Sequence, residues 1–157
     1  MPHSSAERIE REIFSLFANV ANSLGYSEVH GRIIAALLVN GGKCSLQELA
    51  RETGYSISMV SLSLDLLEFF GMVKKVKHAG DRKLYVELQS DLLGGLKKAF
   101  LAKLNKNVET SLQKFKEYRK QLEKLDDGKK KKVLKTLNIL ENEIKRLKKY
   151  LSLIERG

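Results

Sequence analysis

Apolar positions recur at helical spacing along most of this chain, and they change to a strand-like alternation at one place. Ahead of that place, residues 8–22 and 27–39 each carry apolar side chains at intervals of three and four, which predicts two amphipathic helices. Residues 73–78 and 83–88 alternate apolar with charged positions instead, which predicts two strands. Residues 79–82 lie between them and have turn chemistry. The pattern therefore predicts a helical protein that contains one small hairpin.

Two short helices joined by a turn are predicted directly before the hairpin. Ser45 and Glu48 have the spacing of a capping box, in which each side chain accepts a hydrogen bond from a backbone N–H at the start of the first helix. Gly54 can adopt the left-handed conformation that ends this helix and lets the next one leave at a steep angle. Ser56 is suited to cap that second helix, which covers residues 57–70. These positions predict a helix-turn-helix.

The spacing within residues 57–70 separates an inner face from an outer face. The residues expected to face the core are Ile57, Val60, Leu64 and Leu67. The candidates for contacts to DNA bases are the cap and the outer face, namely Ser56, Ser58, Met59, Ser61, Leu62 and Asp65. No Lys, Arg, Asn or Gln occurs in residues 55–70, so this helix lacks the bidentate donors that bind guanine and adenine. We therefore expect modest base specificity from serine hydroxyls and from apolar contacts to thymine methyls.

The hairpin concentrates positive charge. Its basic residues are Lys74, Lys75, Lys77, Arg82 and Lys83, against Asp81 in the turn. Residues 1–90 hold ten basic and ten acidic side chains, whereas residues 91–157 hold nineteen and nine, so the net charge of +10 arises entirely in the second part. Attraction between the first part and DNA phosphates therefore depends on the local field of the hairpin. A basic hairpin directly behind a helix-turn-helix predicts a DNA-binding wing.

These residues resemble the winged-helix regulators of the MarR superfamily, and especially its GbsR-like branch. The similarity covers roughly residues 20–90, and it is carried by Leu46, Leu49, Ala50, Gly54, Ser56, Val60, Ser61, Leu67, Glu68, Gly71, Val73, Gly80, Asp81, Arg82 and Lys83. The resemblance implies homodimers that bind operator DNA, with the helix at residues 57–70 in the major groove. It further implies that Arg82 reaches the minor groove, where it would contribute shape readout. Many members release DNA when a small effector binds, and none is expected to be a catalyst.

Two long amphipathic helices follow the wing and meet at residues 126–128. Ser90 and Asp91 are suited to cap the first of them. The second alternates steps of four and three, which is typical of a coiled-coil seam, through Val133, Leu137, Leu140, Ile144, Leu147, Leu151 and Ile154. Such a hairpin cannot bury two broad faces alone, so we expect these residues to mediate a homodimer. A twofold dimer predicts a pseudo-palindromic operator with half-sites roughly 10 bp apart.

The expected fold is thus mainly α with a small β-wing: a winged helix-turn-helix domain at residues 1–90 and a helical dimerisation arm at residues 91–157. For the effector, Tyr26, Phe69, Phe70 and Phe100 are candidate aromatic walls of a site between head and arm, although core packing explains them equally well. Gly94 and Gly95 interrupt the long-helix pattern as a close packing point or a hinge.

No other cofactor is expected. His3, His30 and His78 lack metal-ligand spacing, so we propose no metal site. Cys44 has no partner cysteine and is more consistent with an inert thiol than with a redox switch. There is no glycine-rich phosphate loop, no paired carboxylates in a credible pocket and no nucleophile with a histidine pattern, so the chain does not look like an enzyme. The absence of a membrane-length apolar run or a signal-peptide pattern predicts a cytoplasmic protein without a membrane partner.

The leading hypothesis is a homodimeric transcriptional repressor that binds double-stranded DNA. Two alternatives stay open at this point. The weakly equipped recognition helix also suits an architectural protein that binds DNA without sequence preference. Exposed Met59, Leu62 and Leu66 also suit a winged-helix module that docks another protein.

Overall fold

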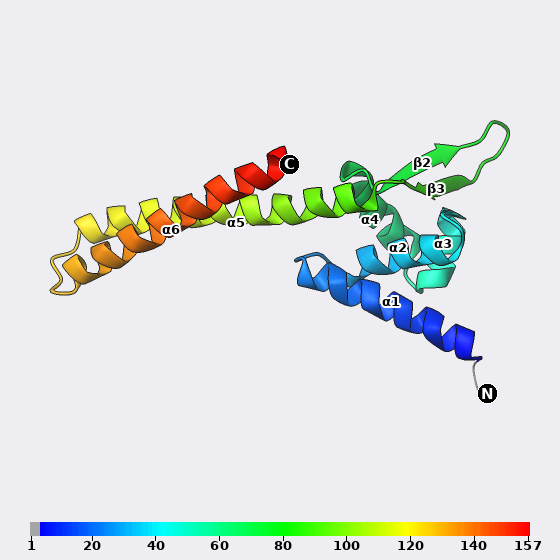
Figure 1. Ribbon diagram of the computed structural model, residues 1–157, viewed down its shortest axis with the longest axis horizontal. Coiled ribbons are helices and arrows are strands. Elements are labelled where there is room, and N and C mark those ends of the chain that lie inside the picture. Colours follow the sequence, from blue (N-terminus) through cyan, green and yellow to red (C-terminus); the bar gives the residue numbers. More distant parts are fainter. Residues whose placement is uncertain (1–3) are drawn as a thin grey trace. The chain divides into compact units, whose positions relative to one another are not determined.

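The computed structural model describes residues 4–157, so the prediction about His3 lies outside the described residues. Its elements, shown in Figure 1, are α1 (Ser5–Ser23), α2 (Glu28–Val39), β1 (Lys43–Ser45), α3 (Leu46–Thr53), α4 (Ile57–Phe69), β2 (Val73–Lys77), β3 (Leu84–Leu88), α5 (Leu92–Glu123) and α6 (Lys130–Arg156). This is a mainly α fold in which a winged helix-turn-helix precedes two long helices, as the sequence predicts. Within residues 4–157, no helix combines the length and the apolar character needed to cross a membrane.

The chain divides into two compact units, and the division falls inside α5. The first unit ends at Ala99 and the second spans Phe100–Gly157. The sequence-based boundary at residue 90, between a DNA-binding domain and a dimerisation arm, stays a prediction.

The core of the first unit is built around α2. Ile33, Ala35, Ala36 and Leu37 of this helix are almost completely buried. They lie in one cluster with Leu49 of α3, Val60 and Leu64 of α4, and Val73 and Val86 of the sheet. Burial of each large side chain of this kind stabilises the fold by about 1.5–3 kcal/mol. The helix-turn-helix and the base of the wing are thus attached to the same core.

The sheet has three antiparallel strands in the order β1-β3-β2. The strands β2 and β3 form the predicted hairpin, with Val73 opposite Leu88 and Lys77 opposite Leu84. The third strand, β1, was not predicted, because three residues are too few to display an alternation. It places Cys44 opposite Val86. Since α3 begins at the residue after β1, the sheet continues directly into the helix-turn-helix.

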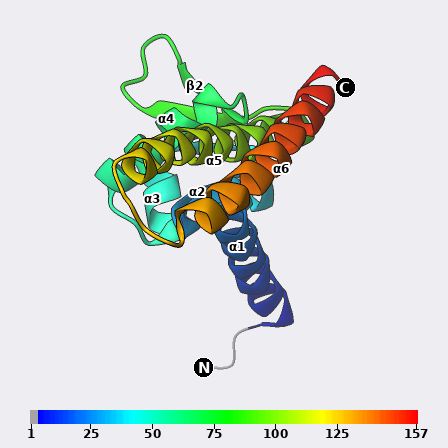
Figure 2. The same cartoon turned by 90° about the vertical axis from the view of Figure 1, so that its left-hand side faces the viewer.

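In the second unit, α6 packs on the part of α5 that belongs to the same unit, and Figure 2 shows the turn between them facing the viewer. Leu101, Val108 and Leu151 are buried against one another, with Ile144 packed beside them. Polar contacts also join the helices: Lys148 Nζ lies 2.7 Å from Glu109 Oε1, and the Asn105 amide donates to Glu155 over 2.6 Å. Arg119 and Glu141 form a further ion pair.

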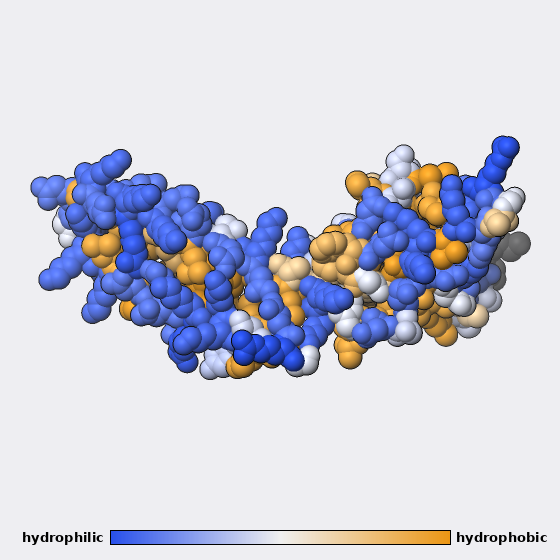
Figure 3. Space-filling view, turned by 90° about the horizontal axis from the view of Figure 1, so that it is seen from above, coloured by the Kyte–Doolittle hydropathy of each residue, from blue (hydrophilic) through white to orange (hydrophobic). Residues whose placement is uncertain are grey.

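The predicted coiled-coil seam on α6 separates into two rows. Leu137, Ile144 and Leu151, spaced by seven, are buried or half-buried. The other row stays exposed within the single chain and consists of Val133, Leu140, Leu147 and Ile154. Figure 3 shows apolar side chains lying among the hydrophilic ones of this region. A single chain therefore buries only one of the two rows of the predicted seam.

Candidate nucleic-acid interface

The turn between α3 and α4 is formed by the local interactions that the sequence predicts. The Glu48 N–H donates to the Ser45 hydroxyl over 3.1 Å, and the Ser45 N–H donates to the Glu48 carboxylate over 3.2 Å, which completes the capping box. Gly54 ends α3 with a φ of 77°, in the left-handed region. Ser56 then caps α4 by accepting the Met59 N–H over 3.1 Å. These caps confirm the predicted helix-turn-helix and orient α4.

Most of the candidate base-reading residues lie on the exposed side of α4. Ser58, Met59, Leu62 and Asp65 are exposed, and Ser61 is half-buried. Leu62 is 73% exposed. Ser56 is also exposed, but its hydroxyl already serves as the helix cap. The outer face therefore offers small hydroxyls and apolar surface.

The expectation that Ile57 faces the core is wrong, because its side chain is 48% exposed. Ile57 is the first residue of α4, and the core that covers Val60 and Leu64 does not reach this end of the helix. Ser63 is instead buried, and its hydroxyl donates to the Met59 carbonyl over 2.8 Å. Ile57 is therefore a further exposed apolar residue at the start of α4.

Four of the five predicted wing cations are available to an outside partner. Lys74, Lys77, Arg82 and Lys83 are exposed, and none of them forms an ion pair or a side-chain hydrogen bond with residues 4–157. The wing tip is ordered by Asp81, whose carboxylate accepts the Lys83 N–H over 2.9 Å. That backbone hydrogen bond holds the pKa of the Asp81 carboxyl below its usual value. The tip thus presents Arg82 and Lys83 on a defined turn.

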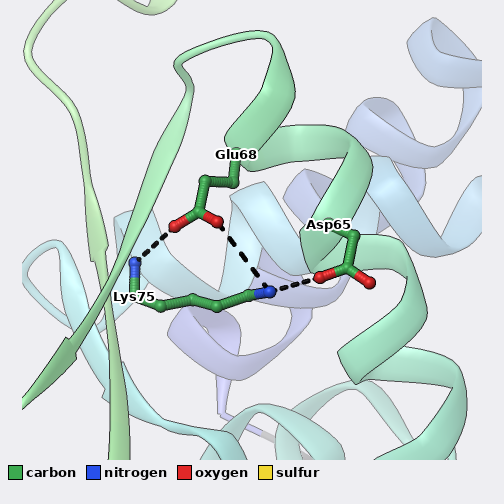
Figure 4. Close-up of polar contacts among 3 residues, drawn as sticks. All are labelled: Asp65, Glu68 and Lys75. Atoms are coloured by element: carbon green, nitrogen blue, oxygen red, sulfur yellow. Dashed lines mark hydrogen bonds and ion pairs between the residues drawn. The ribbon is translucent and has the colours of Figure 1, made fainter.

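Lys75, the fifth cation, is bound within the protein (Figure 4). Its ammonium forms an ion pair with Asp65 and lies 3.9 Å from Glu68 Oε1. Its backbone N–H donates to Glu68 Oε2 over 3.1 Å. Two sequence-predicted DNA contacts, Asp65 and Lys75, therefore contact each other. Glu68 was not among the candidates, although its spacing of three from Asp65 places both carboxylates on one side of α4.

A further cation that the sequence did not single out lies at the base of the wing. Lys43 Nζ, on β1, donates to His78 Nε2 over 2.8 Å and lies 3.4 Å from Glu87 Oε1. The same ammonium lies 5.3 Å from the centre of the Tyr85 ring. Because β1 was not predicted, the position of Lys43 beside the wing was not expected.

The first unit also contains an apolar pocket of about 340 Å³. It is lined by side chains of α1, α2 and α4 and of the first two turns of α5, among them Leu16, Val20, Leu66 and Leu96. Of the four aromatic candidates, Tyr26 and Phe70 line this pocket, whereas Phe69 and Phe100 do not. The Tyr26 hydroxyl donates to the Ala99 carbonyl over 2.7 Å, and burial raises its pKa. Within residues 4–157, no group of three or more metal-ligating side chains is present.

Comparison with known proteins supports the fold. No family model and no curated protein matches the chain. A crystal structure of a transcriptional regulator is 17% identical, with 94% of this chain and 96% of that chain covered and a TM-score of 0.61. The structure of NadR with 4-hydroxyphenylacetate is 20% identical over 80% and 100%, with a TM-score of 0.44. The zinc-responsive MarR family member ZitR of Lactococcus lactis is 18% identical over 74% and 75%, with a TM-score of 0.38. The likeness to the first of these structures, over nearly the whole length of both chains, supports the predicted fold.

Proposed function

We propose that this chain is a transcriptional regulator that binds duplex DNA through the outer face of α4 and the wing β2–β3. The observation that carries this proposal is the set of four exposed wing cations, Lys74, Lys77, Arg82 and Lys83, none of which forms an ion pair within residues 4–157. Exposed cations of this kind increase the affinity for DNA, because they neutralise phosphates and release the counterions bound there. They belong to a hairpin that follows a capped helix-turn-helix, the element that enters a major groove.

Specificity in this proposal is modest and divided between two sources. On α4, Ser58 and Ser61 can form hydrogen bonds with base edges, and Met59 and Leu62 can pack on thymine methyls. On the wing, Arg82 enters a narrow minor groove and contributes shape readout. The chain acts as a homodimer, and the exposed row on α6 supports this because it is the half of the seam that a single chain leaves unburied.

Regulation in this proposal is repression that a small effector relieves. A regulator bound over a promoter blocks access to it, and an effector can weaken that binding only if it prefers the DNA-free state. The apolar pocket beside Tyr26 and Phe70 is the candidate effector site, since it is lined almost wholly by apolar side chains and includes residues of α4 itself. Loss of effector response on Tyr26→Phe or Phe70→Leu would support this assignment.

The first experiment is salt-dependent binding of the purified protein to fragments of its own genome, with footprinting of the tightest fragment. We expect a symmetric protected site. Arg82→Ala should weaken binding about tenfold, within the range for loss of one base-contacting arginine. Arg156→Ala, which removes the same charge from the last helical residue, should leave the affinity unchanged. Equal loss in both variants would reject the assigned role of Arg82.

One alternative is favoured by a specific observation. Ile57, Met59 and Leu62 are exposed apolar residues of α4, and exposed apolar surface often docks other proteins. Binding of all duplexes with equal affinity would instead support an architectural protein, and negligible duplex binding at low salt would support the protein-interaction module.

A further inference from the structure

Lys75 differs from the other wing cations in both its surroundings and its bonds. Its side chain is only 26% exposed, and its ammonium lies between the carboxylates of Asp65 and Glu68. Glu68 also accepts the backbone N–H of Lys75, so it holds this residue at two points. Figure 4 shows the two carboxylates, both from α4, reaching across to the strand β2. We call these three residues the α4–β2 clamp.

The charges of the clamp make Lys75 a poor ligand for DNA phosphate. Two carboxylates and one ammonium leave a net negative charge at this place. A phosphate that approached the ammonium would have to displace Asp65 and would remain close to both carboxylates, and like charges at such distances repel. Neither Lys74 nor Lys77 forms an ion pair with a carboxylate of residues 4–157.

The position of the clamp suits a mechanical role. Only Phe70, Gly71 and Met72 connect α4 to β2. Gly71 in this connection has a φ of 73°, in the left-handed region that glycine adopts readily, and this lets the chain turn sharply from helix to strand. The clamp joins the last turns of α4 to the middle of β2, so it restrains the angle at which the wing leaves the helix. A protein that inserts a helix and a wing into two grooves of one duplex needs that angle held.

We propose that Lys75 is a positioning residue: it binds Asp65 and Glu68 to hold the wing at a fixed angle to α4 and does not itself bind phosphate. This inference rests on the proposed DNA-binding function. It assigns the residue a role opposite to the one expected from its charge, because Lys75 then contributes to specificity without adding to the salt dependence of binding.

The test compares Lys75→Gln, Asp65→Asn and the double variant on the footprinted site and on an unrelated duplex, over a range of salt concentrations. We expect each single variant to lower the ratio of specific to non-specific affinity about fivefold, and the double variant to lower it no further, because all three break the same ion pair. Lys75→Arg should retain the ratio, since it preserves the charge and the pairing.

Two results distinguish a positioning role of Lys75 from phosphate binding: the salt dependence of Lys75→Gln, and whether Asp65→Asn raises or lowers the specific affinity. Lys75→Gln should leave the slope of log affinity against log salt as in the wild type, whereas the matched control Lys77→Gln should reduce it by about 0.9, the value for one phosphate contact. If Asp65 merely withheld Lys75 from a phosphate, Asp65→Asn would free the lysine and raise the specific affinity. A rise of that kind, or a loss of slope in Lys75→Gln equal to the control, overturns the proposal.

Hydrogen exchange without DNA distinguishes failure of this inference from failure of the proposed function. Glu68→Ala, which removes the acceptor of the Lys75 N–H, should speed exchange of the Lys75 amide while the core of α2 exchanges as in the wild type. If the wild-type protein binds no duplex, the proposed function and the role of the clamp in DNA binding both fall. If it binds DNA but exchange at Lys75 is unchanged, only the clamp is overturned.

Discussion

Cys44 lies on β1, is 1% exposed and faces a core that tolerates little change. Burial, and secondarily the negative charges of Glu48 and Glu52, raise the pKa of its thiol to about 11. A thiol with so high a pKa contains very little thiolate at neutral pH, and thiolate is the form that reacts with oxidants. Its surroundings therefore favour the inert thiol over the redox switch among the two interpretations of the sequence.

The same pKa shift predicts how stability depends on pH. The thiol is more basic in the folded chain than its ordinary value of 9.0, so the folded state binds this proton more tightly. The stability gained is present in full below pH 9 and is lost as pH rises toward 11. Because other groups titrate in this range, the measurement is the difference in unfolding free energy between wild type and Cys44→Ala at pH 7, 9 and 10.5. This difference should shrink over the last interval, and a constant difference would contradict the shift.

The helices α1 and α2 of the first unit approach each other closely at Gly31. A Cβ added to Gly31 of α2 would lie 2.1 Å from the Phe17 carbonyl oxygen and 2.8 Å from the Ala18 nitrogen, both backbone atoms of α1. Ala18 and Ala35 are fully buried close by in sequence. Small residues thus let the two helix backbones approach. The helix-turn-helix packs on α2, so this crossing also affects its position.

Gly31→Ala is therefore expected to destabilise the protein. Alanine in a helix interior is worth about 1 kcal/mol more than glycine, but forcing atoms into a packed contact costs about 1–3 kcal/mol, and more when backbone must move. The steric cost should exceed the gain and lower the midpoint of chemical unfolding. Gly128→Ala is the control, because an added Cβ there meets no atom within 4 Å. Equal stability of Gly31→Ala and the wild type would show that α1 and α2 can move apart at this contact without cost.

Local patterns predicted most of the elements, because caps and periodicity act within a few residues. The capping box at Ser45, the end of α3 at Gly54, the wing, and the Asp91 cap that accepts the Gly94 N–H over 2.9 Å are all of this kind. Gly95 was predicted to be a packing point or a hinge, and the structure places Met72 and the Phe70 carbonyl where its Cβ would lie, so close packing is present. The strand β1, the clamp at Lys75 and the exposure of Ile57 depend on which elements meet in space, which no local pattern contains.

On the scale of the whole molecule, charge and apolar surface divide along the chain. Four consecutive lysines, residues 129–132, lie at the start of α6, whereas Glu109, Glu141 and Glu143 form ion pairs with cations farther along the hairpin. The exposed row of Val133, Leu140, Leu147 and Ile154 repeats every seven residues. A heptad row suits a second helix packed along it, and a twofold partner is the simplest source of one.

If the proposed homodimer packs along that row, charged side chains placed there should separate the two chains. Leu140→Glu combined with Leu147→Glu should convert a dimer to a monomer in sedimentation experiments, because burying two carboxylates against apolar side chains is costly. Helix content should not change, since both positions are exposed in the single chain. Asn142→Glu, exposed on another side of α6, is the control and should stay dimeric. A wild-type monomer, or a double variant that still dimerises, would remove the row from the interface.

The order β1-β3-β2 makes β2 an edge strand, and an open edge can recruit a strand from another chain and start aggregation. Lysines on an edge strand oppose this, and β2 carries three of them. In addition, the Lys75 N–H is occupied by the Glu68 carboxylate and is not available to a neighbouring strand. The groups that the proposal assigns to DNA binding and to holding the wing therefore also oppose edge-to-edge pairing of β2 with a second chain.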